Sequence, residues 1–139
     1  MGKIEIKIIK KINKADFINL NKEAGWWKKE YEKDLSFIDG MVKNAFCFFA
    51  AFDGKKMIGM GRSISDKVSD AYIQDVTVLK KYRGKGIGRR LIKKILEFLK
   101  ARHIGWVALI AEPGTGSFYK DFGFKTMKAY KPMILEKRI

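Results

Sequence analysis

The stretch Tyr82-Arg83-Gly84-Lys85-Gly86-Ile87-Gly88-Arg89-Arg90-Leu91 decides the fold of this chain. It joins a strand-like run, residues 73–79, to a strongly helical run, residues 87–102. Glycine at every second position lets the backbone reach φ > 0 and come close to a ligand. The helix that follows turns its unpaired N–H groups and its positive dipole end toward that ligand. The turn is therefore predicted to hold phosphate, with charge supplied by Arg83, Lys85, Arg89 and Arg90.

Two common phosphate-binding loops do not fit this spacing. A P-loop needs Gly-x-x-x-x-Gly-Lys followed by Ser or Thr, but Gly88 precedes two arginines and no hydroxyl is placed to hold magnesium. A dinucleotide fingerprint needs Gly-x-Gly-x-x-Gly, whereas the glycines alternate here and no acidic residue ends a following strand at the right distance. The alternative interpretation is a glycine-rich connection before an ordinary helix. It is disfavoured because simple connections rarely need three glycines flanked by four cations.

The pattern Arg83-x-x-Gly86-x-Gly88 after a strand resembles the acetyl-CoA-binding motif of the GCN5-related N-acetyltransferases, the GNAT family. That motif is Arg or Gln, two residues, Gly, one residue, then Gly or Ala. A second resemblance lies downstream, where Ser117-Phe118-Tyr119-Lys120-Asp121-Phe122-Gly123-Phe124 is similar to the family's Phe-Tyr-x-x-x-Gly-Phe segment. The two motifs occur in the family's order, separated by one predicted helix and one predicted strand.

The resemblance implies that acetyl-CoA is the co-substrate, and no metal is expected because the chain has one cysteine and one histidine. The pyrophosphate would bind the backbone amides of residues 84–89, and the pantetheine arm would pair with an exposed strand edge, as an added strand does. In the family this strand splays from its parallel neighbour at a bulge, which frees an amide near Val76 to polarise the thioester carbonyl. The residues expected to bind the cofactor are Val76, Thr77, Val78, Arg83, Gly84, Lys85, Gly86, Ile87, Gly88, Arg89 and Tyr119.

Catalysis is predicted to use Tyr119 as the general acid. The reference pKa of a tyrosine, roughly 10, lies above that of a thiol, about 8.5, so the phenol can donate its proton to the departing thiolate. Asp75 is the first candidate for the base that takes a proton from the amine, and Glu112 is the second. For Asp75, a structural hydrogen bond to a neighbouring loop is an equally open interpretation.

The acceptor amine is expected to bind between the early helices and the strands that follow. Trp26, Trp27 and Tyr31 are the candidate walls of this pocket, with Gln74 on the fourth strand; a tryptophan face can also bind a cation. Packing under the sheet is the open alternative for one of the two tryptophans. Many relatives carry an asparagine before the Phe-Tyr pair; here Thr115 or Ser117 stands in that region.

Hydrophobic periodicity predicts strands and helices whose order resembles the acetyltransferase fold of the family. The resemblance implies an α+β fold in three layers, with a mixed and mostly antiparallel sheet and a parallel βαβ unit at its centre. Strands are predicted at residues 4–8, 45–52, 57–65, 71–79 and 106–111, the last as a strand covered on both faces. Closing strands are expected at 124–127 and 133–137. Helices are predicted from an N-cap at Asn13 through Leu20, and over residues 29–43, 87–102 and 116–122. The helix over 87–102 carries an apolar stripe that should face the sheet, and residues 53–56 are predicted to form a hairpin turn.

Length and composition fit one domain over residues 1–139, with an apolar fraction of 47% that suits a globular core. No apolar run reaches the roughly 20 residues that cross a bilayer, and the start lacks the apolar segment of a signal peptide, so a cytoplasmic location is expected. Cys47 lies in an apolar run and His103 at a helix end. One cysteine and one histidine leave no zinc site and no Cys-His or Ser-His-Asp arrangement.

The net charge of +15 raises the alternative of a basic nucleic-acid-binding module. Ten basic residues and one acid lie between Lys80 and Arg102, and some of these side chains could equally form a solvated helix face. This alternative is disfavoured because it gives no reason for the Phe-Tyr-x-x-x-Gly-Phe segment. A further alternative is a CoA-binding regulator without catalysis. We therefore expect an acetyl-CoA-dependent N-acetyltransferase that acts by direct transfer on a small-molecule or protein amine. The resemblance also makes a homodimer possible.

Overall fold

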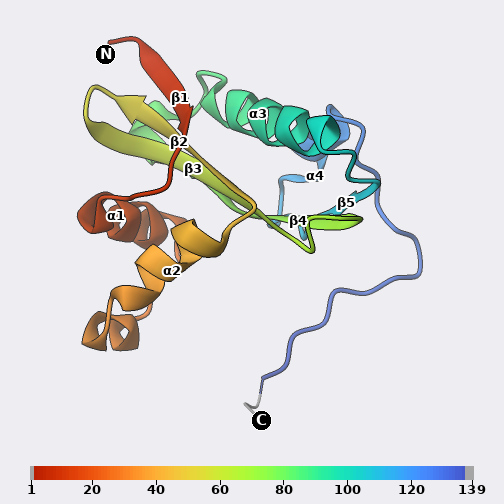
Figure 1. Ribbon diagram of the computed structural model, residues 1–139, viewed down its shortest axis with the longest axis horizontal. Helices are drawn as coiled ribbons and strands as arrows, with labels where there is room; N and C mark the ends of the chain where they lie inside the picture. The colour runs from red at the N-terminus through yellow and green to blue at the C-terminus, as the bar shows by residue number, and fades with distance from the viewer. Residues whose placement is uncertain (1, 137–139) are drawn as a thin grey trace.

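The computed structural model describes residues 2–136, which form one mixed sheet with helices on both of its faces (Figure 1). The strands are β1 (Ile4–Ile8), β2 (Cys47–Asp53), β3 (Lys56–Ser65), β4 (Asp70–Val78) and β5 (Trp106–Ala108). The α-helices are α1 (Lys14–Ala24), α2 (Ser36–Asn44), α3 (Ile87–Ala101) and α4 (Gly116–Lys120); the 3₁₀ turns are η1 (Lys29–Lys33) and η2 (Lys80–Tyr82). None of the described helices is long and apolar enough to cross a bilayer.

The sheet has the order β1-β2-β3-β4-β5, with antiparallel pairs except for the parallel pair β4–β5. The mixed, mostly antiparallel sheet and its parallel unit through α3 are therefore confirmed. The predicted place of the parallel pair at the centre is wrong for the described residues: it stands at one end of the sheet, because β5 pairs only with β4. Helix α3 covers one face and helices α1 and α2 cover the other, which gives three layers (Figure 1).

Helix α3 shows how the sequence pattern places the core. Its buried side chains are Ile87, Leu91, Ile92, Ile95 and Leu99, the predicted apolar stripe. They pack on β2 and β3, whose side chains are buried on both faces over most of their length. Because both faces of these strands are covered, their sequences read as continuous apolar runs rather than alternating ones.

Local signals mark several element ends as predicted. The Asn13 side chain caps α1 by accepting a hydrogen bond from the Asp16 amide at 3.0 Å. Gly54, with φ of 62°, forms the turn between β2 and β3. The helix predicted over residues 29–43 is broken, because the Asp34 carboxylate accepts a hydrogen bond from the Ser36 amide and starts α2 anew.

The C-terminal third departs from the prediction. Strand β5 stops at Ala108 instead of residue 111 and forms the edge of the sheet. The prediction that both of its faces are covered is wrong, because none of its side chains is fully buried and Trp106 is 40% exposed. The closing strands predicted at 124–127 and 133–137 are wrong for the described residues, since 124–136 form no strand; Lys137 lies outside them. A three-residue edge offers little backbone for pairing, and the side chains of Met133 and Ile134 find no apolar surface.

Two glycines of β3 allow the helix to approach the sheet closely. An ideal Cβ on Gly61 would lie 3.0 Å from the Ile95 Cδ1 atom of α3 and 3.2 Å from the Val76 Cγ2 atom of β4. A Cβ on Gly59 would lie 3.3 Å from the Leu91 Cδ1 atom. A side chain at either position would push α3 away from β3 and β4.

We predict that Gly61→Val lowers the free energy of unfolding by about 1–3 kcal/mol, because the added methyl groups overpack the contact with Ile95 and Val76. Urea unfolding followed by circular dichroism measures the effect. Gly105→Val is the matched control, since a Cβ there meets nothing within 4 Å, and it should change stability by less than about 0.5 kcal/mol. Equal stability of the two variants would contradict this account of the packing.

Candidate active site

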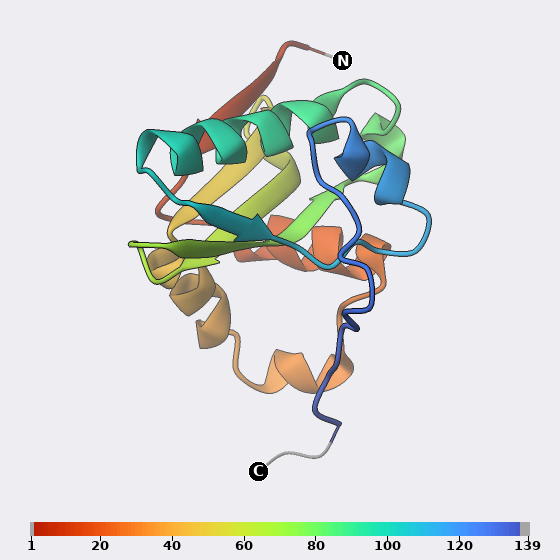
Figure 2. The same cartoon turned by 90° about the vertical axis from the view of Figure 1, so that its right-hand side faces the viewer.

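A cavity of about 580 Å³ lies where the end of β4, the glycine turn, the start of α3 and helix α4 meet. Figure 2 shows α4 beside the first turn of α3. Segments far apart in the sequence contribute to its wall. The lining residues are Ala24, Trp26, Val76, Thr77, Val78, Tyr82, Arg83, Gly84, Gly86, Ile87, Gly88, Arg89, Glu112, Thr115, Phe118 and Tyr119.

The glycine turn has the backbone conformation that its sequence predicts. Gly84 and Gly86 have φ of 76° and 78°, in the left-handed region that side chains with a Cβ disfavour. Gly86 is the N-cap of α3, and no side chain caps the first turn of that helix. The first turn also holds no acidic residue. Its N–H groups and dipole therefore offer an anion site at the cavity wall.

The four cations predicted around the turn are used in different ways. Arg83 donates from Nε to the Val78 carbonyl at 2.9 Å, and Arg90 donates from Nη2 to the Ile4 carbonyl at 2.9 Å. Arg89 forms a 2.9 Å ion pair with Asp121 and lies over the Phe122 ring. Arg83 and Arg89 line the cavity, whereas Lys85 and Arg90 do not. Three arginines thus brace the turn, while Lys85 is an exposed side chain beside it.

Strand β4 has an open edge at the cavity. It pairs with β5 only through residues 70–72, so over residues 73–78 the described part of the chain supplies no partner strand on that side. The register with β3 also shifts, because Asp75 and Val76 together stand opposite the single residue Gly61. This is a β-bulge, with Asp75 at φ of 58°. Val76, Thr77 and Val78, which line the cavity, therefore belong to a strand edge that β5 leaves unpaired.

Tyr119 of α4 reaches the same cavity as the glycine turn. Burial raises the pKa of its phenol above the ordinary value, and the nearby negative charge of Glu112 raises this pKa further. The ring packs edge-on against Phe118 at 5.0 Å and Phe124 at 6.0 Å. Phe118 in turn approaches Gly88, where a Cβ would lie 3.6 Å from its Cζ atom. The Phe-Tyr segment is thereby docked on the first turn of α3.

Glu112 and Trp26 meet across the cavity from opposite ends of the chain. The Trp26 Nε1 group donates a 2.9 Å hydrogen bond to the Glu112 Oε1 atom. Thr115 also lines the cavity, but its hydroxyl donates a 2.7 Å hydrogen bond to the Glu112 backbone carbonyl. This hydroxyl therefore stabilises the local turn over residues 112–115. Ser117 is exposed and is not among the lining residues. No sequence signal predicts the contact between Trp26 and Glu112.

Besides Lys85, four predicted site residues lie outside the cavity. Asp75 forms a 2.6 Å ion pair with Arg62, and the exposed Gln74 precedes it on β4; neither lines the cavity. Trp27 and Tyr31 pack against each other at 5.3 Å and both contact Phe37, in an aromatic cluster outside the cavity. Among the described residues the Trp27 Nε1 group is buried without a hydrogen-bond partner. Only Trp26 of the predicted acceptor-binding residues reaches the cavity.

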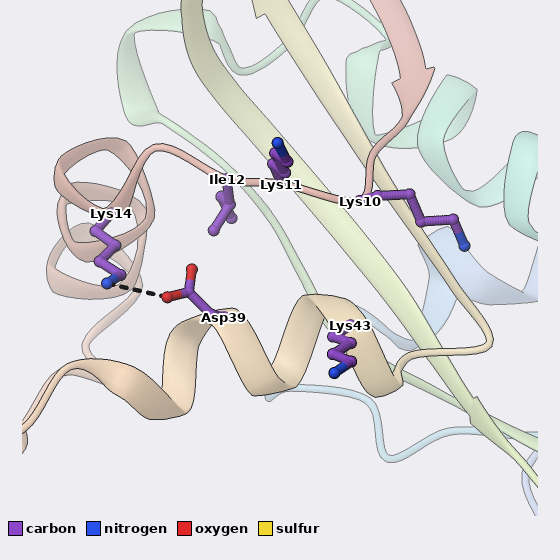
Figure 3. A pocket seen from close by; sticks show the side chains of 6 residues that line it. All are labelled: Lys10, Lys11, Ile12, Lys14, Asp39 and Lys43. Atoms are coloured by element: carbon purple, nitrogen blue, oxygen red, sulfur yellow. Dashed lines mark ion pairs between the residues drawn. The ribbon is translucent and has the colours of Figure 1, made fainter.

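A second hollow, of about 640 Å³, lies between the β1–α1 connection and α2 (Figure 3). It is lined by Lys10, Lys11, Ile12, Lys14, Asp39 and Lys43. Lys14 is paired with Asp39 at 3.0 Å, and the amino groups of Lys10, Lys11 and Lys43 extend in different directions (Figure 3). The lysines therefore do not converge on one anion. Across residues 2–136, no three His, Cys, Asp or Glu side chains gather to hold a metal ion.

The model of the acetyltransferase (GNAT) family matches residues 8–124, so the chain belongs to the GNAT acetyltransferases, a family whose reaction is acyl transfer from acetyl-CoA. The chain is 31% identical over 115 residues to the uncharacterized N-acetyltransferase ycf52 of Gracilaria tenuistipitata var. liui, covering 83% of this chain and 63% of that protein. It is 41% identical over 71 residues to the chloroplastic GCN5-related N-acetyltransferase 2 of Arabidopsis thaliana, covering 51% of this chain and 28% of that protein.

The fold agrees with a solved structure of a probable acetyltransferase. The crystal structure of SA2161, a probable acetyltransferase of methicillin-resistant Staphylococcus aureus, matches with a TM-score of 0.84 at 25% identity, over 97% of this chain and all of that one. By contrast, the chain spans less than two thirds of the length of the two curated relatives described above. Because one of these relatives is chloroplastic, the cytoplasmic location of this protein stays a prediction.

We predict that Glu112→Gln lowers the pKa of Tyr119, because the tyrosinate is an anion that the Glu112 carboxylate repels. The pKa should stay above the ordinary value, since burial, its larger cause, remains. NMR titration of isotope-labelled tyrosine, assigned with Tyr119→Phe, measures the change. The control Glu97→Gln, an exposed carboxylate on α3, should leave the Tyr119 pKa in place. A Tyr119 pKa that is the same in both variants would contradict the coupling to Glu112.

Proposed function

We propose that this protein is an acetyl-CoA-dependent N-acetyltransferase that transfers acetyl directly to the primary amine of a small molecule or a protein. One observation carries the proposal: the glycine turn, the open edge of β4 and Tyr119 all line one cavity. A cavity of about 580 Å³ also lies in the range of about 300–1,000 Å³ that is usual for ligand sites.

The cofactor would lie along the wall formed by β4 and α3. The N–H groups of Gly84, Gly86 and Gly88 and the start of α3 would hold the pyrophosphate. Arg83 and Arg89 add positive charge at the same wall. The pantetheine amides would pair with the edge of Val76–Val78 as an added strand does, which brings the thioester toward the bulge.

Two groups of the chain would assist the transfer of the acetyl group, a backbone N–H near Val76 and the Tyr119 phenol. The amine nitrogen attacks the thioester carbonyl, so that a C–N bond forms and the C–S bond breaks. A backbone N–H near Val76 would stabilise the oxyanion. The Tyr119 phenol would give its proton to the departing thiolate, and its raised pKa keeps that proton in place at neutral pH.

Glu112 is the better placed of the two candidate bases. Its carboxylate lines the cavity beside Trp26, whereas the Asp75 carboxylate is engaged by Arg62. The proton lost by the amine would pass to Glu112 directly or through one water. The same carboxylate and the Trp26 ring would first attract the protonated amine by charge and cation–π contact. The acceptor pocket is thus assigned to Trp26 and Glu112 rather than to the cluster around Trp27.

We predict that acetyl-CoA at 100 times its Kd raises the free energy of unfolding by about 2.7 kcal/mol. Thermal unfolding with acetyl-CoA, desulfo-CoA, ATP and DNA measures the specificity. If only DNA stabilised the protein, and this effect fell steeply with salt, the result would contradict the enzyme and support the nucleic-acid-binding module. Stabilisation by acetyl-CoA without thiol release on a broad panel of amines would support the non-catalytic CoA-binding regulator instead.

We predict that Tyr119→Phe lowers kcat by about 10²–10⁴-fold, with a much smaller effect on the Kd of acetyl-CoA. The wild-type kcat should fall as the pH rises through the raised Tyr119 pKa, because only the protonated phenol can donate. This alkaline limb should be missing from the variant. Thiol release measured across pH tests both points. Tyr130→Phe, at a position 74% exposed, is the control. Full turnover of Tyr119→Phe at every pH would remove Tyr119 as the proton donor.

A further inference from the structure

The bulge in β4 depends on an unusual backbone conformation at Asp75. Its φ of 58° lies in the left-handed region, where glycine is the usual residue at the first bulge position. Aspartate tolerates this region better than most residues but still disfavours it. A conformation of this kind persists only where surrounding contacts hold it. The described structure therefore has to contain a contact that holds Asp75.

Arg62 of β3 supplies that contact. Its Nε group donates to the Asp75 Oδ2 atom at 2.6 Å, and the two side chains are only 15% and 23% exposed. Arg62 pairs in register with Gln74, so it reaches one residue further along β4 to the bulge itself. A charge-assisted hydrogen bond that is mostly shielded from water is screened little by salt. Neither Arg62 nor Asp75 lines the cavity.

Gly61 completes the arrangement from the opposite strand. It stands alone against Asp75 and Val76, and an ideal Cβ there would lie 3.2 Å from the Val76 Cγ2 atom. At the bulge, the Val76 side chain therefore packs against Gly61, close to the space that a side chain on residue 61 would occupy. Pairing of β4 with β5 ends at Tyr72, three residues before the bulge, and Val76–Val78 then line the cavity.

We propose that Arg62 is a positioning residue for acetyl transfer, acting through its ion pair with Asp75 to hold the bulge that presents the Val76–Val78 edge to acetyl-CoA. The inference rests on the proposed function, because it assigns that edge to the cofactor. It also gives Asp75 a role other than proton transfer. The pair does not touch the reacting atoms; it fixes the backbone that does.

The decisive experiment compares Arg62→Met with two double variants. Arg62→Met should lower kcat/KM for acetyl-CoA by about 10–100-fold, the scale of an error of about 1 Å in positioning. Adding Asp75→Gly should recover most of that loss, because glycine adopts φ > 0 without the ion pair. Adding Asp75→Ala should not recover it, since alanine disfavours this φ. Both double variants remove the Asp75 carboxylate that Arg62→Met leaves without its ion pair. The two double variants therefore differ in the backbone preference of residue 75.

Each outcome bears on the inference. Recovery in the glycine variant alone supports a positional role, whereas equal activities of the glycine and alanine variants overturn it. Wild-type kcat/KM in Arg62→Met also overturns it. If Arg62→Met does not fold, the two double variants, which lack the unpaired charge, still provide the comparison.

A second readout separates this inference from the proposed function. Amide hydrogen exchange at Val76–Val78, followed by NMR without cofactor, should quicken in Arg62→Met and return toward wild-type in Arg62→Met/Asp75→Gly. Wild-type protein that binds no acetyl-CoA would overturn the proposed function and, with it, the assignment of the edge to the cofactor. Wild-type protein that binds acetyl-CoA, with exchange unchanged in Arg62→Met, would overturn the inference alone.

Discussion

The close contact between α3 and β3 is the constraint on which the arrangement of the site depends. Gly59 and Gly61 leave room for Leu91 and Ile95 of the helix, and Gly61 also leaves room for Val76 of β4. Since α3 is continuous over 15 residues, its buried contact with the sheet also sets where its first turn lies. The uncapped N-terminus of α3 and the bulged edge of β4 are thereby brought to one cavity.

Charge near this cavity is used chiefly to shape the backbone. Arg83 donates a hydrogen bond to the Val78 carbonyl, and Arg90 donates one to the Ile4 carbonyl. Arg62 holds Asp75, and Arg89 joins α3 to Asp121 after α4. A positive charge that makes a defined hydrogen bond fixes geometry as well as potential. In the proposed cofactor site, main-chain N–H groups would therefore bind the cofactor. The arginines help to hold the backbone that carries these groups, in addition to supplying positive charge.

Predictions from the sequence held where the signal was local. The Asn13 cap, the turn at Gly54 and the stripe along α3 each follow from residues within a few positions of one another. The predictions were wrong for segments that need a neighbouring strand to pair with. The strands expected after residue 123 do not form in the described chain, because a strand needs a neighbouring edge and β5 offers only three residues.

The sequence by itself determined the glycine turn before α3, the family resemblance and the place of Tyr119 in its Phe-Tyr segment, because each depends on short spacings along the chain. Only the tertiary structure decided which acidic residue and which tryptophan meet at the cavity. Trp26 and Glu112 are 86 residues apart and are joined by one hydrogen bond, whereas Asp75 is held by Arg62. Such pairings follow from how the layers pack, and no pattern within a single segment records them.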